Sequence, residues 1–117
     1  MNLKLTIAAT AAALTLTACG GGSLVQPGVP TGFLEIQNDT RENLGVVTIS
    51  QCSASSHGGN RMGFGNWIEP GDSAEFEISE GCYDIQAGGS MEIDGSFRAA
   101  TTRMNIVAGQ RSRFTVR

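Results

Sequence analysis

Beyond residue 32 the chain is divided into short segments in which apolar and polar residues alternate. In residues 73–79, Phe76 and Ile78 alternate with Glu75 and Glu77. A period of two residues places apolar side chains on one face of a β-strand and polar side chains on the other. No segment after the N-terminal region keeps the 3.6-residue period of an amphipathic helix. The pattern therefore predicts an all-β fold.

Turn-forming residues separate the alternating segments at short intervals. Pro70-Gly71 precedes one segment, Gly88-Gly89 interrupts another, and Asp94-Gly95 is a strong hairpin dipeptide. Because short strands punctuated in this way are typical of two-layered folds, we predict a small antiparallel β-sandwich. Its expected strands, about seven in number, lie within residues 33–37, 44–52, 73–79, 82–87, 91–93, 97–107 and 111–117.

The first nineteen residues have the composition of an export signal. Lys4, the only lysine of the chain, precedes the apolar run 5–16. This run is shorter than the ~20 residues that span a bilayer as a helix. A positive start followed by such a run is typical of a secretory signal peptide. The motif Leu16-Thr17-Ala18-Cys19 that follows resembles the bacterial lipobox, which ends in an obligatory cysteine.

The resemblance to lipoproteins implies a membrane anchor. It implies cleavage before Cys19, a diacylglyceryl thioether on the Cys19 sulfur, and an acyl chain such as palmitate on its amino group. Gly20 follows the cysteine, where an aspartate would signal retention in the inner membrane. The resemblance thus implies the outer membrane, with the domain in the periplasm, and leaves surface exposure open. We expect a signal peptide at residues 1–18, the lipidated cysteine and a flexible Gly/Ser/Pro tether at 19–32, and the β-sandwich domain at 33–117.

The two remaining cysteines, Cys52 and Cys82, are thirty residues apart. Because the periplasm is oxidising, we predict that they form a structural disulfide. A metal pair and a redox pair are the alternatives. A metal site needs further ligands, yet the chain has a single histidine, His57, and redox cysteines usually form a Cys-x-x-Cys motif.

Charge is separated along the sequence. The net charge of −3 argues against a general nucleic-acid binder held by phosphate contacts. Residues 20–94 carry eleven acidic residues and two arginines, whereas residues 95–117 carry five arginines and no acidic residue. We predict that the late arginines pair across strands with Glu35 or with Glu75 and Glu77. The alternative is a basic stripe that meets an acidic partner or anionic lipid.

Residues suited to catalysis are scarce. Ser55 and Ser56 precede His57, but a catalytic triad is a spatial arrangement that also needs an orienting acid. We therefore expect His57 to be an ordinary exposed histidine in a polar loop. No spacing of histidine, cysteine and acidic residues suits zinc. We predict no catalytic residue, no metal site and no cofactor.

A long loop is predicted between residues 53 and 66, which are rich in glycine and serine. This loop and the residue after it carry residue types that are enriched in the cores of protein interfaces. The alternative is that Phe64 and Trp67 fold back to cover the end of the sandwich beside the disulfide. The predicted partner-binding residues are Arg61, Met62, Phe64 and Trp67.

Several motifs resemble those of small exported proteobacterial β-domains of unknown function. They are Asn38-Asp39-Thr40, Ile49-Ser50, Ile68-Glu69-Pro70-Gly71-Asp72-Ser73 and Gly81-Cys82-Tyr83-Asp84-Ile85. The resemblance implies a β-fold and brings no activity and no site.

These observations together predict a non-enzymatic lipoprotein of the outer membrane, whose loop-rich end binds an envelope protein. Two alternatives stay open. The protein could inhibit a periplasmic hydrolase such as lysozyme, with a protruding loop that fills the active site. It could instead bind or hydrolyse a small ligand by means of His57. We predict no nucleic-acid partner.

Overall fold

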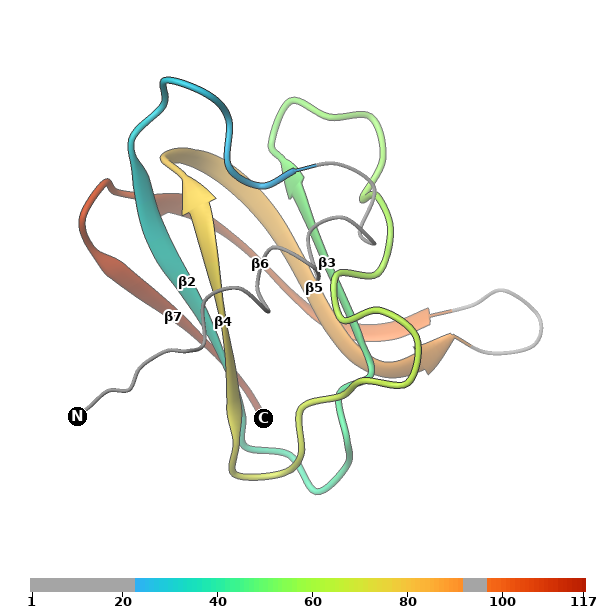
Figure 1. Ribbon diagram of the computed structural model, residues 1–117. Coiled ribbons are helices and arrows are strands. Elements are labelled where there is room, and N and C mark those ends of the chain that lie inside the picture. Colours follow the sequence, from blue (N-terminus) through green and yellow to red (C-terminus); the bar gives the residue numbers. More distant parts are fainter. Residues whose placement is uncertain (1–22, 92–96) are drawn as a thin grey trace.

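The computed structural model describes residues 23–91 and 97–117, and this part of the chain contains β-strands and no helix. The predicted signal peptide, Cys19 and the Asp94-Gly95 turn lie outside the described residues. The predicted all-β fold is confirmed. The strands are β2 (Thr31–Asn38), β3 (Val46–Gln51), β4 (Ser73–Ser79), β5 (Gly81–Met91), β6 (Phe97–Ile106) and β7 (Arg111–Val116) (Figure 1).

Two three-stranded sheets form the domain, in the orders β4-β2-β7 and β3-β5-β6. They lie face to face as two layers, so the predicted sandwich is confirmed (Figure 1). Five of the strands pair antiparallel with a neighbour, but β7 pairs with β2 in parallel. This parallel pair arises because β6 and β7 belong to different sheets. The chain crosses between the layers at the turn that contains Gly109 (φ 78°) instead of returning beside β6.

The described residues contain six strands, against the about seven predicted, because β5 does not end at Gly88-Gly89. The strand continues to Met91, and its register against β6 shifts between Gly88 and Met91. Glycines inside a strand often mark such an irregularity, since they tolerate a locally distorted backbone. The predicted break is therefore a distortion within one strand.

The core lies between the two sheets and follows the predicted alternation. In β2, Leu34 and Ile36 are fully buried, while the residues that alternate with them, Phe33, Glu35 and Gln37, are only partly buried. They meet the inward side chains of the opposite sheet, of which Ile85 is fully buried. The remaining buried apolar side chains include Leu44, Val47, Ile49, Met62, Ile68, Phe76, Ile78, Tyr83, Ile106 and Val116.

The folded part of the chain begins earlier than predicted. Leu24 is buried, and its carbonyl accepts a hydrogen bond from the backbone N–H of Ser79 at 2.9 Å. The backbone N–H of Gln26 donates to the Ser79 hydroxyl at 2.7 Å. The predicted tether at 19–32 is therefore wrong over its second part, because an apolar side chain joins the core there and β2 begins at Thr31. Residues 19–22 lie outside the described residues.

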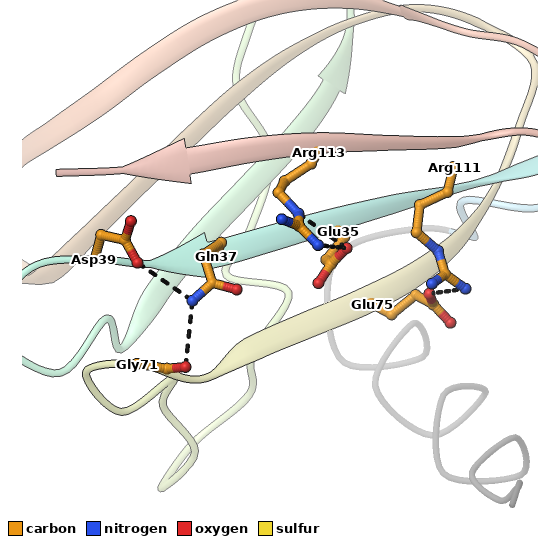
Figure 2. A network of polar contacts seen from close by, with 7 residues as sticks. All are labelled: Glu35, Gln37, Asp39, Gly71, Glu75, Arg111 and Arg113. Carbon is orange, nitrogen blue, oxygen red and sulfur yellow. Dashed lines mark hydrogen bonds and ion pairs between the residues drawn. The ribbon is translucent and has the colours of Figure 1, made fainter. Parts of the chain in front are cut away.

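The late arginines pair with acidic residues across neighbouring strands. On the outer face of β4-β2-β7, Arg111 contacts Glu75 at 2.6 Å and Arg113 contacts Glu35 at 3.2 Å (Figure 2). On the other sheet, Arg103 contacts Asp84 at 2.8 Å. The predicted cross-strand pairing is confirmed. Because the arginine of each pair is more than half exposed, each pair stabilises the fold only slightly.

Candidate functional site

Two large aromatic side chains are exposed in the segment that joins β3 to β4. Phe64 is fully exposed, with a relative exposure of 106%, and Trp67 is half-exposed at 50%. Phe64 therefore does not fold back over the end of the sandwich, which excludes that alternative for this residue. We call these two side chains the aromatic tip. Among the large apolar side chains whose burial the structure describes, they share this degree of exposure only with Val107.

Buried residues hold the chain on both sides of the aromatic tip. Met62 precedes it and is 6% exposed, and Ile68 follows it and is 3% exposed. Ile68 forms an antiparallel bridge with Leu44, in which each backbone N–H donates to the other carbonyl at 2.9 Å. Both anchors belong to the hydrophobic core. The segment is therefore fastened at two points and presents Phe64 and Trp67 between them.

The placement of Met62 and Arg61 corrects the predicted partner-binding loop. Both residues are only 6% exposed, so neither offers its side chain to a partner. Met62 fills the core, whereas Arg61 lies along the free edge of β3. The backbone N–H of Arg61 donates to the carbonyl of Val47 at 2.6 Å, and its guanidinium donates to the carbonyl of Ile49 at 3.3 Å. Burial lowers the pKa of the Arg61 guanidinium.

Asn60 completes this cover over the edge of β3. Its side-chain oxygen accepts hydrogen bonds from the backbone N–H groups of Val47 and Met62, both at 3.0 Å. Its amide nitrogen donates to the carbonyl of Gly45 at 2.9 Å. An unpaired strand edge invites pairing with another chain, and side chains or loops that cover the edge prevent it. Asn60 thus forms hydrogen bonds with backbone groups at this edge that a neighbouring strand would otherwise bind.

The turn that carries Phe64 has a defined backbone. Gly63 and Gly65 flank it with φ angles of 79° and 81°, in the left-handed region that other residues rarely adopt. The side-chain amide of Asn66 donates to the carbonyl of Met62 at 2.9 Å and closes the turn. The two glycines let the chain reverse tightly on both sides of Phe64. This reversal projects the phenyl ring away from the core.

A buried asparagine fixes the end of the sandwich from which the aromatic tip projects. Asn38 is fully buried, and its amide nitrogen donates to the carbonyls of Glu42 and Ile68, both at 2.8 Å. Its side-chain oxygen accepts from the backbone N–H and the hydroxyl of Thr40, at 2.9 and 2.6 Å. Asn38 therefore joins the turn after β2 to the residue that follows Trp67.

The aromatic tip and the start of the described chain lie at opposite ends of β4. The tip segment reaches the foot of this strand through Ile68, while Leu24 contacts Ser79 at its far end. In Figure 1 the blue segment lies near the arrowhead of β4, and the olive segment before the strand lies at its foot. A seven-residue strand is roughly 20 Å long at about 3.3 Å per residue. This strand therefore separates the tip end from the end where the N-terminal segment enters.

The predicted disulfide joins Cys52 and Cys82, whose Cα atoms are 5.4 Å apart. It links the residue after β3 to the second residue of β5, and the backbone N–H of Cys52 donates to the carbonyl of Cys82 at 3.0 Å. The long loop begins at this bridge. The disulfide therefore fixes the C-terminal end of β3. The loop then runs back along β3 through Asn60 and Arg61, and the aromatic tip follows these residues.

His57 is exposed and lines a shallow depression of about 430 Å³ on the β3-β5-β6 sheet. The depression also contains Asp84 and Arg103. Arg103 donates to both carboxylate oxygens of Asp84, at 2.8 and 3.0 Å. This hydrogen bonding, assisted by the positive charge of Arg103, lowers the pKa of the Asp84 carboxyl. Both carboxylate oxygens of Asp84 are therefore engaged by Arg103.

The described residues contain neither a metal-binding cluster nor a helix that could span a membrane. Within 23–91 and 97–117, no group of three His, Cys, Asp or Glu side chains is placed to hold a metal ion. No helix in this part of the chain has the length and apolar character to cross a membrane.

Comparisons with known proteins returned no match. No protein-family model matches the sequence, and neither the curated proteins nor the solved structures include a significant match. The similarity to exported proteobacterial β-domains and to lipoproteins stays a prediction from motifs.

Proposed function

We propose that this protein is a lipid-anchored envelope protein that binds a protein partner through its aromatic tip. The observation that supports the proposal most strongly is the full exposure of Phe64 on a turn that buried residues fasten on both sides. Burying a side chain of this size stabilises a complex by roughly 1.5–3 kcal/mol. Aromatic side chains that fill a pocket of the partner supply much of the binding energy of protein interfaces.

The way the tip is held also supports binding. A partner that captures a mobile loop must offset the entropy lost when the loop becomes ordered. Here the core anchors, the flanking glycines and the Asn66 hydrogen bond define the backbone around Phe64 before any partner is present. Phe64 is thus presented on a backbone that is already ordered. Such preparation favours affinity because it lowers the cost of association.

The lipid anchor accounts for the direction in which the tip faces. Three residues lie between Cys19 and Ser23, so the two are at most about 14 Å apart when the chain is fully extended. Leu24 lies at the end of β4 opposite to the aromatic tip. A lipid on Cys19 would keep the Leu24 end near its membrane and direct the tip away from that membrane. The partner is therefore an envelope protein and not the bilayer that holds the anchor.

Two other functions rank below this one. Inhibition of a periplasmic hydrolase uses the same tip, and hydrolase assays with purified enzymes distinguish an inhibitor from an accessory protein. A small-ligand or hydrolytic role would use the depression beside His57. It ranks lower because both oxygens of Asp84, the carboxylate in that depression, already accept hydrogen bonds from Arg103.

A photoreactive residue introduced at position 64 tests the proposal in intact cells. We expect it to form a specific adduct with one envelope protein, since Phe64 is the most exposed apolar residue of the tip. The same residue at position 107 is the matched control, because Val107 is an exposed apolar residue near the opposite end of the domain. Identical adducts from both positions, or none from position 64, would contradict the proposal.

The anchor is tested by mass spectrometry of the protein extracted from membranes. We expect Cys19 as the N-terminal residue, with a diacylglyceryl thioether and an acylated amino group. Three acyl chains on one residue hold a protein firmly, whereas a single chain holds only marginally. An unmodified Cys19 in a soluble product would exclude the anchored state. A Cys19→Ser variant, which lacks the thiol, serves as the control and should keep its signal peptide.

A further inference from the structure

We infer that the partner of the aromatic tip presents a cationic rim around an apolar pocket. This inference rests on the proposed function and specifies the chemistry of the partner. It follows from charge at the tip end of the sandwich, where four exposed carboxylates outnumber two exposed guanidinium groups. The carboxylates belong to Asp39, Glu42, Glu69 and Asp72. The guanidinium groups belong to Arg41 and to Arg117, which follows Val116, whose carbonyl accepts from the backbone N–H of Asp39 at 2.8 Å.

Backbone contacts bring these carboxylates to the same end. The backbone N–H of Asn38 donates to the carbonyl of Asp72 at 2.9 Å, and the amide of Asn38 donates to the carbonyl of Glu42 at 2.8 Å. Glu69 is next to Ile68, whose carbonyl also accepts from Asn38 at 2.8 Å. The two turns therefore meet at a single buried side chain. Their acidic residues are exposed around it.

The carboxylates at this end lack the arginine partners found on the sheets. On the outer face of β4-β2-β7, Glu35 and Glu75 are each paired with an arginine, and Asp84 is paired on the other sheet. None of the ion pairs of the described residues involves the four tip-end carboxylates. A third arginine of this region, Arg61, is buried and contacts the carbonyl of Ile49. The four exposed carboxylates of the tip end therefore exceed its two exposed guanidinium groups, those of Arg41 and Arg117.

An exposed aromatic pair with an acidic surround selects its partner by charge. Complementary charge speeds encounter and rejects like-charged surfaces, while the aromatic side chains supply contact area. An anionic lipid surface would be repelled by these carboxylates. A protein whose apolar pocket is flanked by lysine or arginine fits both features. We therefore take a basic protein surface as the occupant of this site.

Trp67 provides a direct readout, because it is the only tryptophan of the chain and lies in the tip. The full-length lipidated protein is placed in phosphatidylcholine nanodiscs. Two sets of short peptides are added, each with a central apolar residue and with flanks of either lysine and arginine or glutamate and aspartate. We expect the cationic set to shift Trp67 emission to the blue with affinity about tenfold higher than the anionic set at low salt. The difference should shrink at high salt because exposed charges are screened.

Two matched charge reversals locate the effect. Asp72 lies directly before β4 and Glu80 directly after it, so Asp72→Lys and Glu80→Lys make the same change at opposite ends of one strand. We expect Asp72→Lys to weaken binding of the cationic peptides by about three- to tenfold, and Glu80→Lys to change it by less than about twofold. Equal responses to the two peptide sets, equal effects of the two variants, or no response to the cationic set would overturn the inference.

The Phe64→Ser variant separates the inference from the proposed function. If Phe64→Ser abolishes binding while Asp72→Lys leaves it unchanged, the tip binds a partner but the cationic rim is wrong. If Phe64→Ser leaves binding unchanged, the proposed function itself fails. Nanodiscs that contain phosphatidylglycerol test whether the tip binds an anionic membrane instead of a protein. A blue shift caused by this lipid alone, without peptide, would place the tip in a membrane and overturn the protein-binding account.

Discussion

Replacing Asn38 with leucine is expected to lower the free energy of unfolding by about 3–4 kcal/mol. The variant removes four hydrogen bonds of a fully buried amide. It also leaves the carbonyls of Glu42 and Ile68 without this donor. A buried polar group left without a partner costs about 1–3 kcal/mol. Urea denaturation followed by Trp67 fluorescence measures the change.

Gln37→Leu is the matched control for Asn38→Leu. Gln37 is the preceding residue of β2 and faces outward, where its amide contacts Asp39 and the carbonyl of Gly71 at 3.3 and 3.2 Å (Figure 2). Because these contacts are exposed to water, we expect its loss to cost less than about 1 kcal/mol. Equal effects of the two substitutions would show that the buried amide does not hold this end together.

Loss of the disulfide is expected to lower the free energy of unfolding by a similar amount. A double Cys52→Ser and Cys82→Ser variant opens a loop of about thirty residues, for which the chain-entropy relation gives about 3–4 kcal/mol. This is a large share of the roughly 5–15 kcal/mol that stabilises a typical domain. The urea midpoint of the variant should match that of the wild-type protein under reducing conditions. An unchanged midpoint in both samples would mean that the bridge contributes nothing to stability.

The sheet strands could be predicted because their faces differ in polarity. The alternation of Phe76 and Ile78 with glutamates fixes which side of β4 is buried. The predicted strand 33–37 stops before Asn38, yet Asn38 continues the inward phase of Leu34 and Ile36. That phase is the signal that could have placed its side chain in the core. A polar residue at an inward position is buried when local backbone groups can satisfy it.

The loop was harder to predict because its side chains follow no period. Residue type alone could not separate Phe64, which is exposed, from Met62, which is buried. Their positions depend on the free edge of β3, whose carbonyls and N–H groups bind Asn60 and Arg61. That edge exists only after the sheets have assembled. Of the four residues predicted from interface-like composition, Phe64 and Trp67 are therefore exposed, whereas Arg61 and Met62 are buried.

The most direct test of the aromatic tip as a binding surface is the affinity of this protein for the partner captured through position 64. Calorimetry compares binding of the purified partner to the full-length wild type, Phe64→Ser and Val107→Ser proteins. We expect Phe64→Ser to weaken binding by at least about thirtyfold, the effect of losing a central aromatic contact, with an unchanged urea midpoint. Val107→Ser should leave the affinity within about twofold of the wild type. Wild-type affinity in a correctly folded Phe64→Ser protein would contradict the claim that the aromatic tip is the binding surface.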